Sequence, residues 1–141
     1  MIIKSLELAD YRNYEDLVIH FDRGTNILIG DNAQGKTNIL EAIYVAATTK
    51  SHKGSKDSEM IRFDREEGHI RTILEKDGVS VRIDMHLRKN KSKGIAVDGN
   101  KLKKAADLLG LCNVALFSPE DLSIILLPKE TNCISQILNV S

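Results

Sequence analysis

The chain has 141 residues, which suits one domain or one lobe of a larger domain. Apolar residues make up 42% and charged residues 28%, and Lys plus Arg equals Asp plus Glu at 20 each. These values indicate a folded, soluble protein and exclude a uniformly basic coat for nucleic acid. No apolar run reaches the roughly 18 residues that cross a bilayer, and the N-terminus lacks secretory features. We therefore expect a cytoplasmic protein with no membrane partner.

The first predicted elements are two strands and a helix. Apolar residues alternate with other side chains over 17–21, which favours a strand. The continuous apolar run at 26–29 predicts a short strand buried on both faces. Apolar residues recur at helical spacing from Lys36 to about Ala47, which predicts a helix whose buried side includes Ile39 and Ile43.

An antiparallel section follows a polar loop at 50–57. Strands are predicted at 69–76 and 79–87 because Asp77 and Gly78 form a hairpin turn signal between them. A third short strand covers 95–97. The pattern then predicts a helix at 103–109, a strand at 114–117 and a helix that begins after Ser118. This order indicates an α/β core with an antiparallel β-meander.

One motif carries recognisable chemistry. The segment 30–37 fits the phosphate-loop pattern G-x-x-x-x-G-K-[ST], with a predicted strand before it and a predicted helix after it. The residues predicted to bind the nucleotide are Gly30, Asp31, Asn32, Ala33, Gln34, Gly35, Lys36 and Thr37. The glycines let backbone N–H groups converge on phosphate oxygens. Lys36 supplies a positive charge for the phosphates, and the Thr37 hydroxyl is a ligand for Mg²⁺.

Several further strings accompany this motif in a fixed order. The tetrapeptide 11–14 reads Tyr-Arg-Asn-Tyr, and the phosphate-loop motif continues over 35–43 as Gly-Lys-Thr-Asn-Ile-Leu-Glu-Ala-Ile. Segment 50–53 then reads Lys-Ser-His-Lys, and segment 117–122 reads Phe-Ser-Pro-Glu-Asp-Leu. Over about residues 1–127 the chain resembles the RecF family of bacterial recombination-mediator ATPases, relatives of the SMC-type ABC ATPases. The resemblance implies the N-terminal lobe of a P-loop, ABC-ATPase-like head, followed by a tail at 128–141 that departs from the family pattern.

The resemblance also implies a function. Such heads bind ATP with Mg²⁺, and two of them close on two ATP molecules as an ATP-dependent homodimer. The dimer binds double-stranded DNA near single-strand gaps without sequence preference and helps to load recombinase together with mediator proteins. The family acts in DNA replication, recombination and repair of DNA damage, within the SOS response, and hydrolyses ATP slowly.

The resemblance places two further groups near the nucleotide. Arg12 lies where relatives place an arginine close to the nucleotide, although a solvated residue at a strand end is an equal interpretation. Glu120 and Asp121 lie where a loop of ABC ATPases reaches toward metal and γ-phosphate. The glutamine usual at that place is absent, so these two carboxylates also fit as first-turn residues favoured by a helix dipole.

A basic segment is the candidate contact for DNA. Between Arg88 and Lys104 there are seven Lys or Arg residues and one Asp. Positive side chains neutralise backbone phosphates, so Arg88, Lys89, Lys91 and Lys93 are the predicted DNA contacts. A solvated loop is the other interpretation, since charge runs usually face water. Lys50, Lys53 and Lys56 form a second, smaller cluster.

Some expected family motifs have no match. We find no apolar strand that ends in Asp followed by a catalytic Glu, and no Ser-Gly-Gly-Gln type signature. The chain therefore reads as a truncated or altered product that binds ATP and hydrolyses it extremely slowly. Alternatives are a stand-alone nucleotide-binding switch, a small kinase without a role on DNA, and a DNA-binding module that is not an enzyme. A GTPase is disfavoured because 90–93 lacks the Asp of N-K-x-D.

Overall fold

The structure is a computed structural model that describes residues 1–29, 35–112, 114 and 137–139. The elements, in chain order, are β1 (Ile2–Tyr11), β2 (Tyr14–His20), β3 (Asn26–Leu28), α1 (Lys36–Thr48), α2 (Asp57–Met60), β4 (Glu67–Lys76), β5 (Val79–Arg88), β6 (Gly94–Val97), β7 (Asn100–Lys101), the 3₁₀ helix η2 (Ala105–Leu108) and β8 (Ile137–Asn139).

The main layer is an antiparallel sheet of six strands in the order β2-β1-β4-β5-β6-β7. Its long central strands confirm the predicted meander. The turn residues Asp77 and Gly78, with φ of 51° and 78°, join β4 to β5, and Asp98 and Gly99 repeat this geometry between β6 and β7. Both central residues of such a turn have positive φ, which is why the Asp-Gly pairs predict it.

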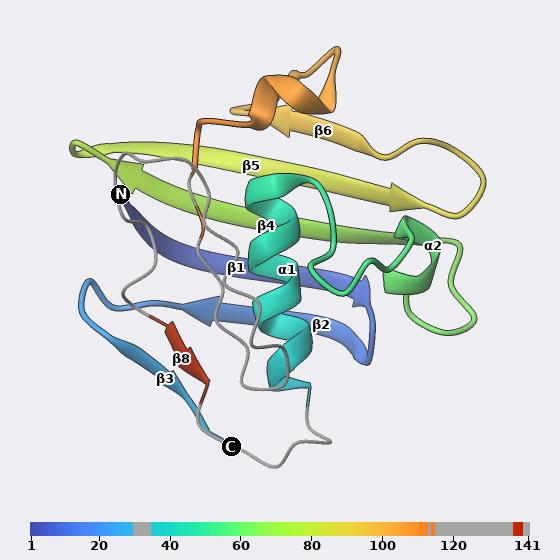
Figure 1. The fold of residues 1–141 in the computed structure, drawn as a ribbon, viewed down its shortest axis with the longest axis horizontal. Coiled ribbons are helices and arrows are strands. Elements are labelled where there is room, and N and C mark those ends of the chain that lie inside the picture. Colours follow the sequence, from blue (N-terminus) through green and yellow to red (C-terminus); the bar gives the residue numbers. More distant parts are fainter. Residues whose placement is uncertain (30–34, 113, 115–136, 140–141) are drawn as a thin grey trace.

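Helix α1 packs across one face of this sheet (Figure 1). The helix is apolar on the side that meets β1, β4 and β5, as its periodicity predicted, and its bounds match the prediction closely. Alternate side chains of the strands meet it, including Leu6, Ile70 and Ile83, which are at most 1% exposed. This contact fixes the direction of α1 and therefore the position of its first turn.

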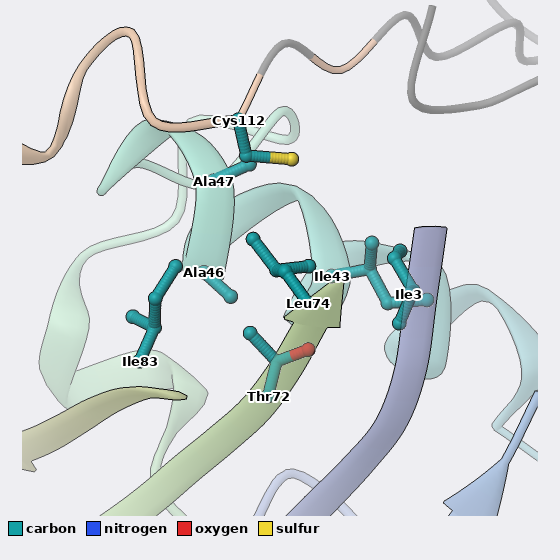
Figure 2. A pocket seen from close by; sticks show the side chains of 8 residues that line it. All are labelled: Ile3, Ile43, Ala46, Ala47, Thr72, Leu74, Ile83 and Cys112. Carbon is teal, nitrogen blue, oxygen red and sulfur yellow. The ribbon is translucent and has the colours of Figure 1, made fainter. Parts of the chain in front are cut away.

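The interface between α1 and the sheet is closely packed. Figure 2 shows the side chains that line a small cavity at this interface, with Cys112 at one side. The cavity has a volume of about 10 Å³. A cavity needs about 10–15 Å³ to hold one water, so this space is at the lower limit. It is lined by Ile3, Ile43, Ala46, Ala47, Thr72, Leu74, Ile83 and Cys112.

Strand β3 differs from its prediction. It pairs in parallel with β8, in a two-stranded sheet separate from the six-stranded one (Figure 1). Ile27 and Ile29 are 54% and 83% exposed, so the expected burial on both faces is wrong. An apolar run marks a strand, but the partners that would cover its two faces are a property of the whole fold.

The predicted helix at 103–109 is also wrong in kind and length. Only one 3₁₀ turn forms there, η2, in which the Asp107 side chain accepts a hydrogen bond from the Lys104 backbone N–H at 3.3 Å. Leu108 is the one buried residue of η2. A single buried side chain gives a longer helix little packing, and isolated short helices are marginal. Within the described residues, no helix is both long and apolar enough to span a membrane.

Candidate nucleotide-binding site

The site is built around the first turn of α1. Gly35 precedes the helix in the left-handed conformation, with φ of 86°, and Lys36 and Thr37 are its first two residues. The first turn holds no acidic residue, and among the described residues no side chain caps it. The N–H groups at a helix start and the positive end of the helix dipole suit an external anion.

The turn between β1 and β2 lies directly against this helix start. A Cβ atom placed on Gly35 would come within 2.7 Å of both the Asn13 side-chain nitrogen and the Tyr14 hydroxyl. Asn38, in the first turn of α1, donates a hydrogen bond from Nδ2 to Asn13 Oδ1 at 2.9 Å. Glycine at position 35 thus serves two needs, a positive φ and the close approach of the Asn13 and Tyr14 side chains.

Lys36 and Thr37 differ in exposure. The Lys36 side chain is buried, with 5% of the residue exposed, whereas Thr37 is exposed. A phosphate beside Lys36 would thus meet a cation that is already largely out of bulk water, where charge pairing is stronger than at the surface. The predicted roles of both residues toward phosphate and Mg²⁺ remain predictions.

A buried carboxylate organises the neighbouring side chains. Glu41, on the second turn of α1, is 0% exposed. It accepts hydrogen bonds from Arg12 Nε and Nη2 at 2.9 and 2.7 Å, from Ser51 Oγ at 2.5 Å and from the Tyr11 hydroxyl at 3.2 Å. Lys53 Nζ lies 4.0 Å from the same carboxylate. The two cations and one anion leave a net positive charge next to the first turn of α1.

The electrostatics of this network favour an ionised Glu41. Burial would raise the pKa of Glu41, but hydrogen bonds from Arg12 and Ser51 outweigh it and hold the pKa below its ordinary value. Burial together with the Glu41 charge raises the pKa of Tyr11, so its hydroxyl stays a donor. A buried charge is tolerated only when it is paired and hydrogen-bonded, and Glu41 meets both conditions.

Arg12 is therefore not a solvated residue at a strand end, and that interpretation is wrong. Its side chain is 21% exposed and also donates to Ser55 Oγ and to the Glu59 carbonyl, at 2.8 and 2.9 Å. Sequence reasoning singled out Arg12 but missed Glu41. Little in the sequence signals Glu41, because position 41 is two residues from both Ile39 and Ile43 and so lies on the opposite side of the helix from them.

The four candidate DNA contacts do not form one free basic patch. Lys93 is 17% exposed and donates to Asp57 at 2.7 Å and to the Thr49 carbonyl. Lys89 pairs with Glu66 at 3.2 Å. Arg88 donates to the Ser92 carbonyl at 2.9 Å, and Lys91 is exposed. A solvated loop is therefore also wrong for Lys93, because the fold brings to it an acceptor just after α1 and another from α2.

The remaining candidate residues, Gly30 to Gln34 and Glu120 with Asp121, lie outside the described residues.

Comparison with known proteins identifies the family. The family model described as an AAA domain matches residues 5–135. The chain belongs to the AAA domain family. The start of α1 after Gly35 and the antiparallel sheet that α1 packs against agree with that assignment.

Individual relatives refine the comparison. The DNA replication and repair protein RecF of Agathobacter rectalis is 64% identical over 125 residues, which are 89% of this chain and 34% of that protein. RecF of Lachnoclostridium phytofermentans is 62% identical over the same share of this chain and 35% of its own. The chain thus spans about a third of the length of these relatives, and its resemblance to the N-terminal portion of RecF is confirmed.

Solved structures confirm the fold. The recombination mediator protein RecF, solved with ATP, superimposes with a TM-score of 0.79 at 37% identity, over 84% of this chain and 33% of that one. An SMC ATPase structure matches with a TM-score of 0.69 at 22% identity, over 90% of this chain and 87% of that one, and shows a shared fold. The predicted class, the N-terminal lobe of an ABC-type ATPase head with an antiparallel meander, is correct. These matches favour the RecF-like interpretation over a stand-alone switch or a small kinase.

Proposed function

We propose that this chain is the ATP-binding part of a RecF-like ATPase of DNA repair and recombination. The observation that carries the proposal is the first turn of α1. It follows Gly35, begins with Lys36 and Thr37, and contains no acidic residue. Arg12 and Lys53 add positive charge beside it, balanced in part by Glu41. A related RecF was solved with ATP, which supports this choice of ligand.

The residues present fit a magnesium-bound triphosphate. Helix N–H groups and the Lys36 ammonium are donors suited to phosphate oxygens, and the exposed Thr37 hydroxyl is a ligand type that Mg²⁺ accepts. Magnesium would supply charge neutralisation at the β- and γ-phosphates. The crowded Gly35 fits as well, because a Cβ atom there would press against the Asn13 and Tyr14 side chains.

The larger activity follows the resemblance to RecF. Two such heads would close on two ATP molecules as a homodimer, bind double-stranded DNA in the cytoplasm and act with mediator proteins. The 141 residues contain neither the Asp-Glu pair that orients water nor the signature segment. One missing trans-acting charge can cost about 10³–10⁵ in rate, so this chain is expected to bind ATP and hydrolyse it extremely slowly.

Calorimetric titration with Mg·ATP tests the proposal. Lys36→Ala removes a charged hydrogen bond of about 1.5–3 kcal/mol, so affinity should fall about tenfold to a hundredfold. Lys50→Ala is the matched control, since Lys50 is an exposed lysine just beyond the other end of α1. Equal affinity in the unaltered chain and Lys36→Ala would contradict the phosphate site.

A further inference from the structure

The face of the six-stranded sheet that turns away from α1 carries mainly polar side chains. They alternate along β1, β4 and β5 with the buried side chains that meet α1. An open groove of about 250 Å³ lies on this polar face, over β2, β1, β4 and β5. The residues that line it include Glu7, Ala9, Asp16, Val18, His69 and Arg71.

The smallest side chain in the groove is that of Ala9. The strand register places Asp16 of β2 and His69 of β4 on either side of Ala9, in one row across the sheet. Both neighbours have longer side chains, so the sheet surface is hollowed over Ala9. Val18 pairs with Glu7 in the adjoining row and is 59% exposed, which adds an apolar wall. The hollow over Ala9 therefore has the size of a side chain and walls of mixed character.

Two carboxylates at this hollow have spare capacity to accept hydrogen bonds. Asp16 forms no ion pair and no side-chain hydrogen bond with any other described residue. Glu7 meets Arg71 Nη1 at 3.4 Å, whereas Arg71 Nε donates to Asp84 at the shorter distance of 2.6 Å. Glu7 and Asp16 are diagonal neighbours across β1 and β2, and such neighbours lie about 7–8 Å apart. One cation between them can therefore reach both.

His69 adds a flat, uncharged surface beside the hollow. Its ring stacks on that of His86, with the centroids 4.1 Å apart and 19° between the ring planes. Because His86 lies on β5, the other face of the His69 ring is turned toward β1 and Ala9. Burial, and after it the charge of His86, lower the pKa of His69, so this ring is neutral at neutral pH.

We propose that the hollow over Ala9 is a docking site for an arginine side chain of a protein partner. A guanidinium is planar, has donors for two carboxylates and stacks on flat rings, which matches the walls of the hollow. The carboxylates of Glu7, Asp16 and Asp84 outnumber the one arginine of the groove, and this charge repels the phosphates of a nucleic acid.

Two further observations delimit the proposal. Among the described residues there is no group of three or more His, Cys, Asp or Glu that could hold a metal ion, so a bare metal cation is a poor occupant. Helix α1 packs on the opposite face of the sheet (Figure 1). The docking site is therefore separate from the first turn of α1, and it stands or falls independently of the proposed nucleotide site.

NMR titration of the full chain tests the proposal, because it detects the weak, rapidly exchanging binding of a single side chain. The probe is the peptide acetyl-Gly-Gly-Arg-Gly-Gly-amide, and its matched control carries citrulline, which has the shape of arginine without the charge. The arginine peptide should shift the amide signals of Ala9, Asp16 and His69, and the citrulline peptide should not.

Three variants locate the contact. Asp16→Asn should weaken binding of the arginine peptide about fivefold, as expected for one partly exposed ion pair. Ala9→Leu fills the hollow and should abolish binding. Glu15→Gln is the control, since it removes the same charge at the next position of β2, where the carboxylate faces Arg62 at 3.3 Å. It should leave the affinity unchanged.

Several results would overturn the inference. Equal affinities for the two peptides, or equal losses in Asp16→Asn and Glu15→Gln, would show a general charge effect. Unshifted signals at Ala9 and Asp16 would place the contact elsewhere, and shifts caused there by a short DNA duplex would assign the face to nucleic acid. Asp16 is exposed, so Asp16→Asn keeps the test decisive even where Ala9→Leu fails to fold.

Discussion

Glu41→Gln removes the buried charge that holds Arg12 while keeping the size of the side chain. The carboxylate is 0% exposed, and Arg12, its main partner, is 21% exposed. Removing one partner of a buried ion pair costs about 3–5 kcal/mol because the other charge is left uncompensated. Arg12 keeps some contact with water, so we expect the low end, a loss of about 3 kcal/mol in the free energy of unfolding.

Urea denaturation measures this loss. With a slope of about 2 kcal/mol per molar, the midpoint should fall by about 1.5 M at an unchanged slope. Glu66→Gln is the control, because the Glu66–Lys89 pair is largely exposed, and it should cost less than about 1 kcal/mol. The double variant Arg12→Gln/Glu41→Gln should lose less than the sum of the single losses, since the two residues act as one unit.

The pH dependence gives an independent check on the same residue. The folded chain holds the pKa of Glu41 below its ordinary value of 4.5, so the stabilisation is present above pH 4.5 and is lost as pH falls through the lowered pKa. Glu41→Gln should lose less stability than the unaltered chain over that acid range. Equal midpoints for Glu41→Gln and Glu66→Gln, with the same acid profile as the unaltered chain, would refute the role given to Glu41.

Two further predictions concern the helix ends. Gly35→Ala and Gly54→Ala both place alanine at positive φ, but of these two glycines only Gly35 has neighbours at 2.7 Å. Gly35→Ala should therefore lose about 1 kcal/mol more in stability than Gly54→Ala, and it should also weaken ATP binding. Similar losses for both would show that the close approach does not matter. Lys93→Met removes the hydrogen bonds to Asp57 and to the Thr49 carbonyl at the end of α1, so it should lower the free energy of unfolding by about 1–2 kcal/mol. The control Lys91→Met should change it by no more than about 0.5 kcal/mol, with both variants measured by thermal unfolding. Equal stabilities would contradict the pairing of Lys93.

Local patterns predicted the elements whose determinants are close in sequence. The helix that follows the phosphate loop has its own apolar side, and the Asp-Gly turns have their own backbone preference. The shape of the meander followed from alternation in β4 and β5. These features depend on neighbours within a few residues, which a sequence displays directly.

Features that depend on distant partners were not predictable in this way. The exposure of Ile27 follows from where β3 lies relative to the six-stranded sheet. The pairing of Lys93 with Asp57 joins residues 36 positions apart, and that of Arg12 with Glu41 joins residues 29 positions apart. A count of charges along the chain cannot show which of them the fold brings together.

Hydrogen–deuterium exchange in the presence of Mg·ATP tests the central claim most directly, namely that the phosphates bind at the first turn of α1. The first N–H groups of an α-helix point out of its N-terminal end, where phosphate oxygens can accept from them. We predict slower exchange in peptides that cover 35–40 and the adjoining turn at 12–14, and no such change in Lys36→Ala. Protection confined to β4 and β5, with 35–40 unaffected while ATP binds, would contradict the account.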